Sequence, residues 1–341
     1  MGKHFFKPET QDALKTLLTD VKSYFRSVSL IKAIESNLPE LLAENELSLD
    51  EICAYYRWNS VATRLLCDTL VTMEWFEVNE AGVYRNSQKM LTLLPELPKL
   101  APLVDDWSRG MVDMSTMPEF LLNDTWDSGK VSEKYSYTQG LATKEETANY
   151  SNAMLDSVEP MADSLIQTID FSLFKKVLDV GGGYGLLAHY IKVGNPLIEW
   201  VGVFDLPLAE EGFKKLQNDQ VLDPSLHFIP GDFFNSELND AYDCITLNRI
   251  LFDWNDEKAK KIVSMCQKAL KPGGILIVHE GCYRLDFNRI AASWLHLLVG
   301  GRLRTCEEVR AVISENTELK IDSTLKSKIP DWYIFVASKS S

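Results

Sequence analysis

The chain of 341 residues is 45% hydrophobic and 25% charged, a composition typical of folded globular proteins and unlike that of disordered, collagen-like or disulfide-rich chains. Its length exceeds the usual size of a single domain, so two domains are expected. The formal net charge of −14 repels phosphate backbones and anionic lipid surfaces, so neither nucleic acid nor a membrane is an expected partner.

The first part of the chain, residues 1–100, has the pattern of a small, mostly helical domain. Apolar residues at helical spacing predict an amphipathic helix over residues 11–37, then a short helix capped by Ser48 and a longer one from about Ser60. Two apolar runs within residues 75–85 flank a turn and predict a hairpin. This order is that of a winged helix, but the acidic side chains of the third helix argue against DNA binding. We expect the spare apolar face to pack against a second copy, giving a homodimer.

Residues 101–170 are predicted to form further helices, rich in methionine and aromatic side chains such as Trp107, Met111 and Met154. Such density is typical of a protein core. The alternative is a flexible apolar wall around a planar ligand. We interpret the segment as a helical linker that also forms a wall of the substrate pocket.

From residue 171 to residue 341, short apolar runs alternate with helical stretches, which is the pattern of an α/β domain. Five runs read as buried parallel strands, at 177–180, 200–204, 226–229, 244–247 and 275–279. Two late runs, 319–324 and 332–337, follow one another without a helix and predict a closing antiparallel pair. We therefore predict a Rossmann-like, doubly wound sheet that is mostly parallel with one antiparallel strand.

The six cysteines stand singly, without the spacing of a metal site, so we expect reduced cysteines and no metal. No apolar run approaches the roughly 18 residues of a membrane span. The first residues lack the apolar core of a leader peptide, and a cytoplasmic location is the resulting expectation.

A glycine loop follows the first predicted strand of the α/β domain, in the segment LDVGGGYG that contains Asp179, Gly181 and Gly183. Glycines let the backbone approach a ligand closely, and the helix that follows offers free N–H groups to an anionic group. The dinucleotide fingerprint fails, because its third glycine position falls on Leu186. Asp179 lies where it could meet an ammonium group, which suits an amino-acid cofactor better than a pyrophosphate.

Two more carboxylates follow the next two strands. Asp205 ends the second strand, where a carboxylate can accept from both hydroxyls of a ribose. Asp232 ends the third strand within reach of an adenine amino group, and Phe233 is available to pack on the ring. Because the carboxyl ends of neighbouring parallel strands lie at one edge of the sheet, these residues predict a site for an adenosyl amino acid.

Six motifs occur in the same order as in a known family: LDVGGGYG, FDLP, PGDFF, DWNDE, LKPGG and GGRLRT. With them, nearly the whole chain resembles the plant caffeate, acetylserotonin and bacterial polyketide O-methyltransferases. The resemblance implies a class I methyltransferase fold, an N-terminal dimerisation domain and S-adenosylmethionine as cofactor, with S-adenosylhomocysteine as product. It implies cofactor contacts at Gly181, Gly183, Asp205, Leu206, Asp232 and Phe233, and at Asn248 beside the methyl donor.

The chain departs from that family at its base. The family's general base is a histidine directly before the Asp-Trp pair, where this chain has Phe252 before Asp253, and a phenyl ring cannot accept a proton. Glu280 matches the first of the two acids that orient that histidine, but Leu303 replaces the second. Both changes point to the absence of the standard histidine mechanism.

Other residues could serve the chemistry. His296 and His279 are alternative bases, each weighed against a satisfied core histidine. Arg249 and Arg302 could hold an anionic substrate, against a role in surface ion pairs. The substrate pocket is expected to include Trp107, Met111, Met154, Trp294 and Leu297.

Three functions remain open. The leading hypothesis is methyl transfer to a small, planar or aromatic molecule whose nucleophile needs little deprotonation, such as a thiolate or an acidic phenol. The second is a relative that keeps the cofactor but performs decarboxylation, hydroxylation or a pericyclic reaction. The third is a non-catalytic binder.

Overall fold

A computed structural model describes residues 8–98, 104, 158–238, 241–285, 289–290, 292–293, 296 and 301–340. The chain divides into two compact units, Met1–Val112 and Asp113–Ser341. Each unit is described by itself. Within the described helices, none is long and apolar enough to cross a bilayer.

The N-terminal unit packs helices around a small sheet. Its elements are α1 (Pro8–Glu35), α2 (Leu38–Glu44), β1 (Leu47–Ser48), α3 (Leu49–Tyr56), α4 (Ser60–Thr72), β2 (Phe76–Val78), β3 (Val83–Asn86), α5 (Gln88–Leu93) and η1 (Leu94–Glu96). The antiparallel sheet has the order β1-β3-β2, so the predicted hairpin is present as β2 and β3.

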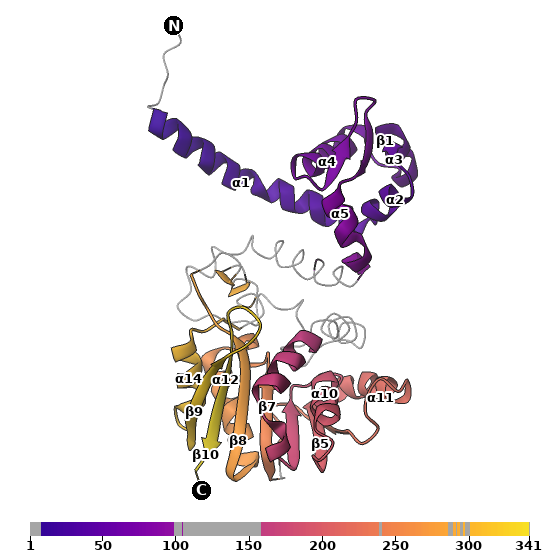
Figure 1. Ribbon diagram of the computed structural model, residues 1–341. Coiled ribbons are helices and arrows are strands. Elements are labelled where there is room, and N and C mark those ends of the chain that lie inside the picture. The colour runs from indigo at the N-terminus through magenta and orange to yellow at the C-terminus, as the bar shows by residue number, and fades with distance from the viewer. Residues whose placement is uncertain are drawn as a thin grey trace. The chain divides into compact units, whose positions relative to one another are not determined.

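Local chemistry explains where these helices begin. Ser48 caps α3 as predicted, in a capping box with Glu51 in which each side chain binds the other's backbone N–H. Asn59 caps α4 by accepting from the N–H groups of Val61 and Ala62. Figure 1 shows α1 as one long helix whose N-terminal part projects away from the other helices of this unit.

The second unit is built on a seven-stranded sheet of order β6-β5-β4-β7-β8-β10-β9. Its strands are β4 (Lys176–Val180), β5 (Trp200–Asp205), β6 (His227–Pro230), β7 (Tyr242–Asn248), β8 (Leu270–Gly281), β9 (Leu319–Lys326) and β10 (Trp332–Lys339). The pairs among β4 to β8 are parallel, whereas β10 runs antiparallel to both β8 and β9. The predicted mostly parallel sheet with one reversed strand is therefore confirmed.

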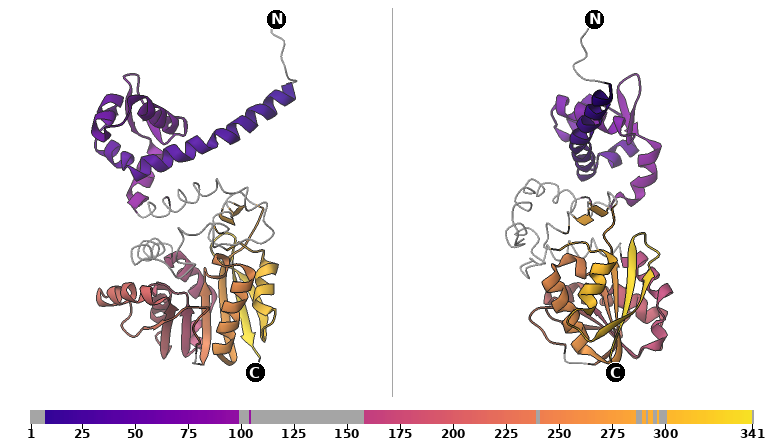
Figure 2. Two further views of the ribbon diagram at one scale, coloured as in Figure 1. Left: turned by 180° about the vertical axis from the view of Figure 1, so that it is seen from behind. Right: turned by 90° about the vertical axis from the view of Figure 1, so that its left-hand side faces the viewer.

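Helices cover both faces of this sheet (Figure 2). They are a helix over residues 158–168, α10 (Leu186–Gly194), α11 (Glu210–Asn218), α12 (Asp256–Ala269) and α14 (Cys306–Ser314), with 3-10 turns η4 (Phe171–Leu173), η5 (Pro207–Ala209) and η6 (Leu251–Asp253). One buried cluster joins the sheet to α12 and α14, and a second joins it to α10 and α11. The order of connections reverses between β4 and β7, the point at which sheets of this type bind ligands beyond the strands' carboxyl ends.

Candidate functional site

The glycine loop leaves β4 at this reversal point. Gly181 has a φ of +74°, and a Cβ built on it would lie 2.3 Å from the Ile250 side chain. Its N–H donates to the carbonyl of Phe204 at 2.8 Å, which ties the loop to β5. Gly183 also has a positive φ, +55°, but a Cβ there would meet nothing within 4 Å. The loop therefore needs glycine for its backbone conformation, and at Gly181 also for space.

Asp205 closes the loop from the end of β5. Its Oδ2 accepts from Gly183 N–H at 2.7 Å and its Oδ1 accepts from Leu206 N–H at 2.7 Å. Each carboxylate oxygen has a second lone pair, so both can still accept from a ligand. Desolvation raises the pKa of this carboxyl, while the two backbone donors oppose the rise.

Phe233 reaches the same loop from beyond β6. Its ring edge lies 3.2 Å from the position of a Cβ on Gly181, and the ring packs against Phe204 and Trp254. The neighbouring Asp232 has a local task as well: its oxygens accept from Phe234 N–H and the Asn235 amide. The ends of β4, β5 and β6 thus bring together the glycine loop, both carboxylates and the aromatic ring that the sequence singled out.

Asp179 lies beneath the loop and is only 1% exposed. Its Oδ1 accepts from the Thr246 hydroxyl at 2.7 Å, whereas its Oδ2 finds no hydrogen-bond donor among the described residues. Burial raises the pKa of this carboxyl to about 7, and the charge of Asp205 adds to the rise. A buried acceptor without a donor is costly, so the site favours a cationic or N–H-bearing group nearby.

A chain of hydrogen bonds fixes Asn248 at the end of β7. Its Oδ1 lies 2.9 Å from His279 Nδ1, and His279 Nε2 lies 2.9 Å from the Ser327 hydroxyl, which meets Ser164 at 2.7 Å. Burial lowers the pKa of His279 to about 4, so the ring is neutral. Because the amide oxygen only accepts, Nδ1 carries the proton and Ser327 donates to Nε2. The Asn248 NH₂ group is left as a donor, and His279 has the role of a satisfied core histidine.

Glu280 supports a backbone turn. Its Oε1 accepts from Ile250 N–H at 3.0 Å and from Leu251 N–H at 2.7 Å, at the start of η6. Burial raises the pKa of this carboxyl to about 8. The turn that it caps carries Phe252, which is 7% exposed. Glu280, which matches the first orienting acid of the family, therefore binds backbone N–H groups in this structure.

Sequence reasoning missed Arg304, which supports the same turn from the other side. The side chain is 2% exposed and donates to the carbonyls of Leu251 and Trp254 at 2.8 Å and to Asp256. The GGRLRT motif was the available signal, but it does not say which arginine turns inward. Arg302, considered for an anionic substrate, instead pairs with Asp256 and Glu308.

The remaining candidates lie in different places. The Arg249 backbone has a φ of +64°, and its N–H donates to the His279 carbonyl at 3.0 Å. The ring of His296 lies 4.3 Å from that of Phe252, and its Nδ1 lies 3.1 Å from Asp253 Oδ1. The expected substrate residues are outside the described residues: Trp107, Met111, Met154, Trp294 and Leu297. Across the described part of the chain, no cluster of side chains could hold a metal ion.

Comparison with known proteins places this site in context. A sequence model of the family described as "O-methyltransferase domain" matches residues 121–317. O-methyltransferase 12 of Dictyostelium discoideum is 35% identical over 161 residues, which are 47% of this chain and 39% of that protein. Des-methyl DIF-1 methyltransferase A of the same organism is 26% identical over 339 residues, and the alignment covers 93% of this chain and 91% of that protein.

A solved structure extends the likeness to the fold of the whole chain. Human N-acetylserotonin methyltransferase in complex with SAM superposes with a TM-score of 0.77 over 100% of both chains, at 22% identity. At this sequence identity the match is evidence for the fold alone.

Proposed function

We propose, since the chain belongs to the O-methyltransferase domain family, that it transfers a methyl group from S-adenosylmethionine to a small molecule and releases S-adenosylhomocysteine. The match to the O-methyltransferase domain model confirms the family and the methyltransferase class that the sequence motifs implied. S-adenosylmethionine, the cofactor that those motifs implied, is also the one bound in the human structure of the same fold. The observation that carries the proposal is the contact of Asp179, Asp205 and Phe233 with one glycine loop.

The residues present fit the cofactor. The free lone pairs of Asp205 suit two ribose hydroxyls, and Asp232 with Phe233 suits an adenine. Asp179 lies beneath the loop with one oxygen that has no donor among the described residues, so its carboxylate charge suits an ammonium group bound over the loop. Asn248 offers its NH₂ beside the methyl donor. When bound, S-adenosylmethionine supplies an electrophilic methyl group on a positively charged sulfur.

The substrate is proposed to be planar, with a nucleophile that does not depend on a base at position 252. Phe252 presents a buried ring there, tilted against the ring of His296 and edge-on to that of Trp332, which favours a flat apolar partner. Glu280 is occupied by backbone N–H groups, so it does not replace the missing imidazole. An acidic phenol or a thiolate meets these conditions.

Two measurements on purified protein test the proposal. Calorimetry with S-adenosylhomocysteine is expected to show one binding site per chain, and labelled S-adenosylmethionine with a panel of planar phenols and thiols is expected to yield S-adenosylhomocysteine. No binding would remove the basis of the proposal. Binding together with substrate turnover but without S-adenosylhomocysteine would favour the alternative of non-methylating chemistry, which the replacement of the base by Phe252 keeps open.

A homodimer through the N-terminal unit is proposed as well. The helix α1 exposes large apolar side chains, with Tyr24 53%, Phe25 67% and Val28 41% accessible, and α4 exposes Val61 and Leu65. Large apolar side chains exposed on two helices that contact each other suit an interface between subunits.

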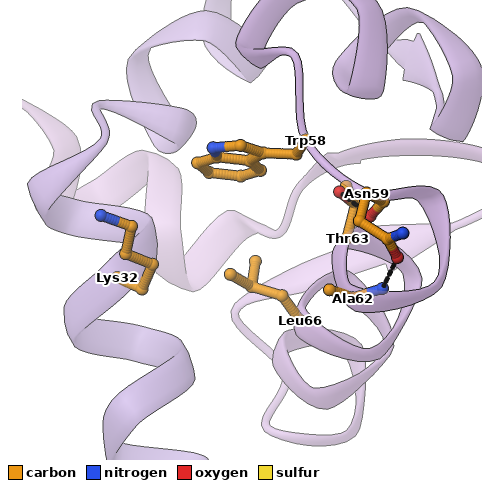
Figure 3. A pocket seen from close by; sticks show the side chains of 6 residues that line it. All are labelled: Lys32, Trp58, Asn59, Ala62, Thr63 and Leu66. Atoms are coloured by element: carbon orange, nitrogen blue, oxygen red, sulfur yellow. Dashed lines mark hydrogen bonds between the residues drawn. The ribbon is translucent and has the colours of Figure 1, made fainter.

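A pocket of about 240 Å³ lies beside this surface, between α1 and α4. Figure 3 shows Lys32 of α1 facing Trp58 and Leu66 across it. The Trp58 ring is stacked on Tyr56 at 4.2 Å, so one wall of the pocket is held in place. The pocket suits one side chain of a second copy, which extends the proposed dimer contact.

A further inference from the structure

The imidazole of His296 lies beside Phe252, the residue that stands where the family has its histidine base. The ring of His296 lies 4.3 Å from the ring of Phe252, with 43° between their planes, so the two side chains share one small space. His296 comes from a different segment of the chain, in the described helical residues between Arg289 and Gly301. Its side chain is 20% exposed, which leaves it accessible to a ligand.

Two contacts fix His296, one with Asp253 of η6 and one with Gly301. Its Nδ1 lies 3.1 Å from Asp253 Oδ1, and its carbonyl accepts from Gly301 N–H at 2.8 Å. Gly301 in turn packs directly on the turn, since a Cβ built on it would lie 1.9 Å from the Phe252 carbonyl oxygen. His296 is therefore held to η6 through its side chain, and its backbone is tied to Gly301, which packs on the same turn.

The partner of Nδ1 decides which nitrogen can accept a proton. An ionised carboxylate has no hydrogen to donate, so the Nδ1 that faces Asp253 carries the proton of the neutral ring. The lone pair then lies on Nε2, the nitrogen directed away from Asp253. A carboxylate in this place also stabilises the imidazolium that forms when Nε2 takes up a proton.

We propose that His296 is the general base of the reaction and that Asp253 is its positioning residue. The inference rests on the proposed methyl transfer. The substrate oxygen forms a bond to the methyl carbon, the carbon–sulfur bond breaks with its electron pair going to sulfur, and the hydroxyl proton passes to His296 Nε2. The imidazolium then releases that proton to solvent. The base has changed its place in the sequence while keeping its place beside residue 252.

The tautomer of His296 is a test that needs neither cofactor nor substrate. The chain has five histidines, so ¹⁵N-histidine labelling gives five pairs of ring-nitrogen signals, and His296→Gln identifies the pair of interest. Above the pH at which the ring is protonated, we expect the Nδ1–H form in the unaltered protein and a shift towards the Nε2–H form in Asp253→Asn. An Nε2–H tautomer in the unaltered protein would overturn the proposal, because Nε2 would then have no lone pair.

Activity on two probes gives the second test. With 2-naphthol, which is protonated at neutral pH, His296→Gln is expected to lower kcat about 100-fold or more, the usual range for a lost general base, with little change in KM. With 4-nitrophenol, which ionises near neutral pH, the same variant is expected to lose only a few-fold. The matched control is His227→Gln, since His227 is an exposed residue at the start of β6, stacked on Trp200.

The outcomes separate this inference from the proposed function. Equal losses on both probes would show that His296 only shapes the site, and would overturn its role as base. If calorimetry shows that His296→Gln binds S-adenosylhomocysteine as the unaltered protein does, the loss lies in proton transfer. If the unaltered protein forms no S-adenosylhomocysteine from either probe, the proposed function fails for phenols, and the tautomer alone decides the position of the lone pair.

Discussion

Glu280 offers the sharpest test of how this site is held together. Glu280→Ala removes the acceptor of two buried backbone N–H groups, those of Ile250 and Leu251. Each orphaned buried group costs about 1–3 kcal/mol, so the free energy of unfolding is expected to fall by roughly 2–6 kcal/mol. Glu280→Gln keeps an acceptor oxygen of the same shape and is expected to cost about 1 kcal/mol at pH 6.

The same carboxyl links stability to pH. Burial raises its pKa from 4.5 to about 8, so the native state keeps a proton that the unfolded chain releases in this window. The free energy of unfolding therefore decreases as pH rises from about 4.5 to about 8. At 1.36 kcal/mol per pKa unit, the full loss is roughly 5 kcal/mol. Asp179 adds a loss of the same sign between pH 3.8 and about 7.

Urea unfolding followed by circular dichroism at pH 5.5, 6.5, 7.5 and 8.5 measures both effects, with separate transitions allowed for the two units. The free energy of unfolding of the unaltered protein is expected to fall towards pH 8.5. That of Glu280→Gln is expected to fall less between pH 6.5 and 8.5, because the amide does not titrate. The matched control is Glu199→Gln, an exposed glutamate paired with Lys175. Equal stability of the Ala and Gln variants, or a pH slope unaffected by Glu280→Gln, would refute the reasoning.

Three further outcomes are expected. Asp205→Ala removes the acceptor of the Gly183 and Leu206 N–H groups and the proposed ribose contacts, and should weaken S-adenosylhomocysteine binding about 10- to 100-fold in calorimetry; unchanged affinity would contradict the site. Arg304→Met removes the side-chain donors to the carbonyls of Leu251 and Trp254 and one of the two arginine partners of Asp256, and should lower the unfolding free energy by about 3–5 kcal/mol in urea titrations. Phe25→Asp on α1 should convert a dimer to a monomer in light scattering, and a dimer that survives it would place the interface elsewhere.

The local pattern of apolar residues was sufficient to predict most strands of the α/β unit. The runs predicted at 177–180 and 200–204 form β4 and β5, which differ from the prediction by one residue at one end of each. Both strands are buried in the interior of a parallel sheet, so they read as continuous apolar runs ended by glycine or by an acid. The prediction for β8 was less complete, because its strand begins at Leu270 and includes a Pro-Gly-Gly segment that normally indicates a turn.

The positions of the proposed cofactor residues were predictable for a related reason. Asp179, Asp205 and Asp232 lie in or directly after strands, so strand prediction alone places them at one sheet edge. The tasks of Glu280 and Arg304 were not predictable, because their partners are backbone atoms about 30 and 50 positions away along the chain. Composition and spacing carry no signal for a side chain that binds main chain in a distant segment.

The base position shows the limit of comparing motifs residue by residue. Phe252 and Leu303 together predict that the family's imidazole and its second orienting acid are absent from those two positions. Proton transfer, however, requires only a lone pair beside the nucleophile, from whichever segment supplies it. Asp253, Phe252 and His296 meet through a turn that Glu280 and Arg304 hold rigid. If His296 is the base, as proposed, the supports of that turn also position it, so the substitutions at Glu280 and Arg304 should lower kcat as well as the free energy of unfolding.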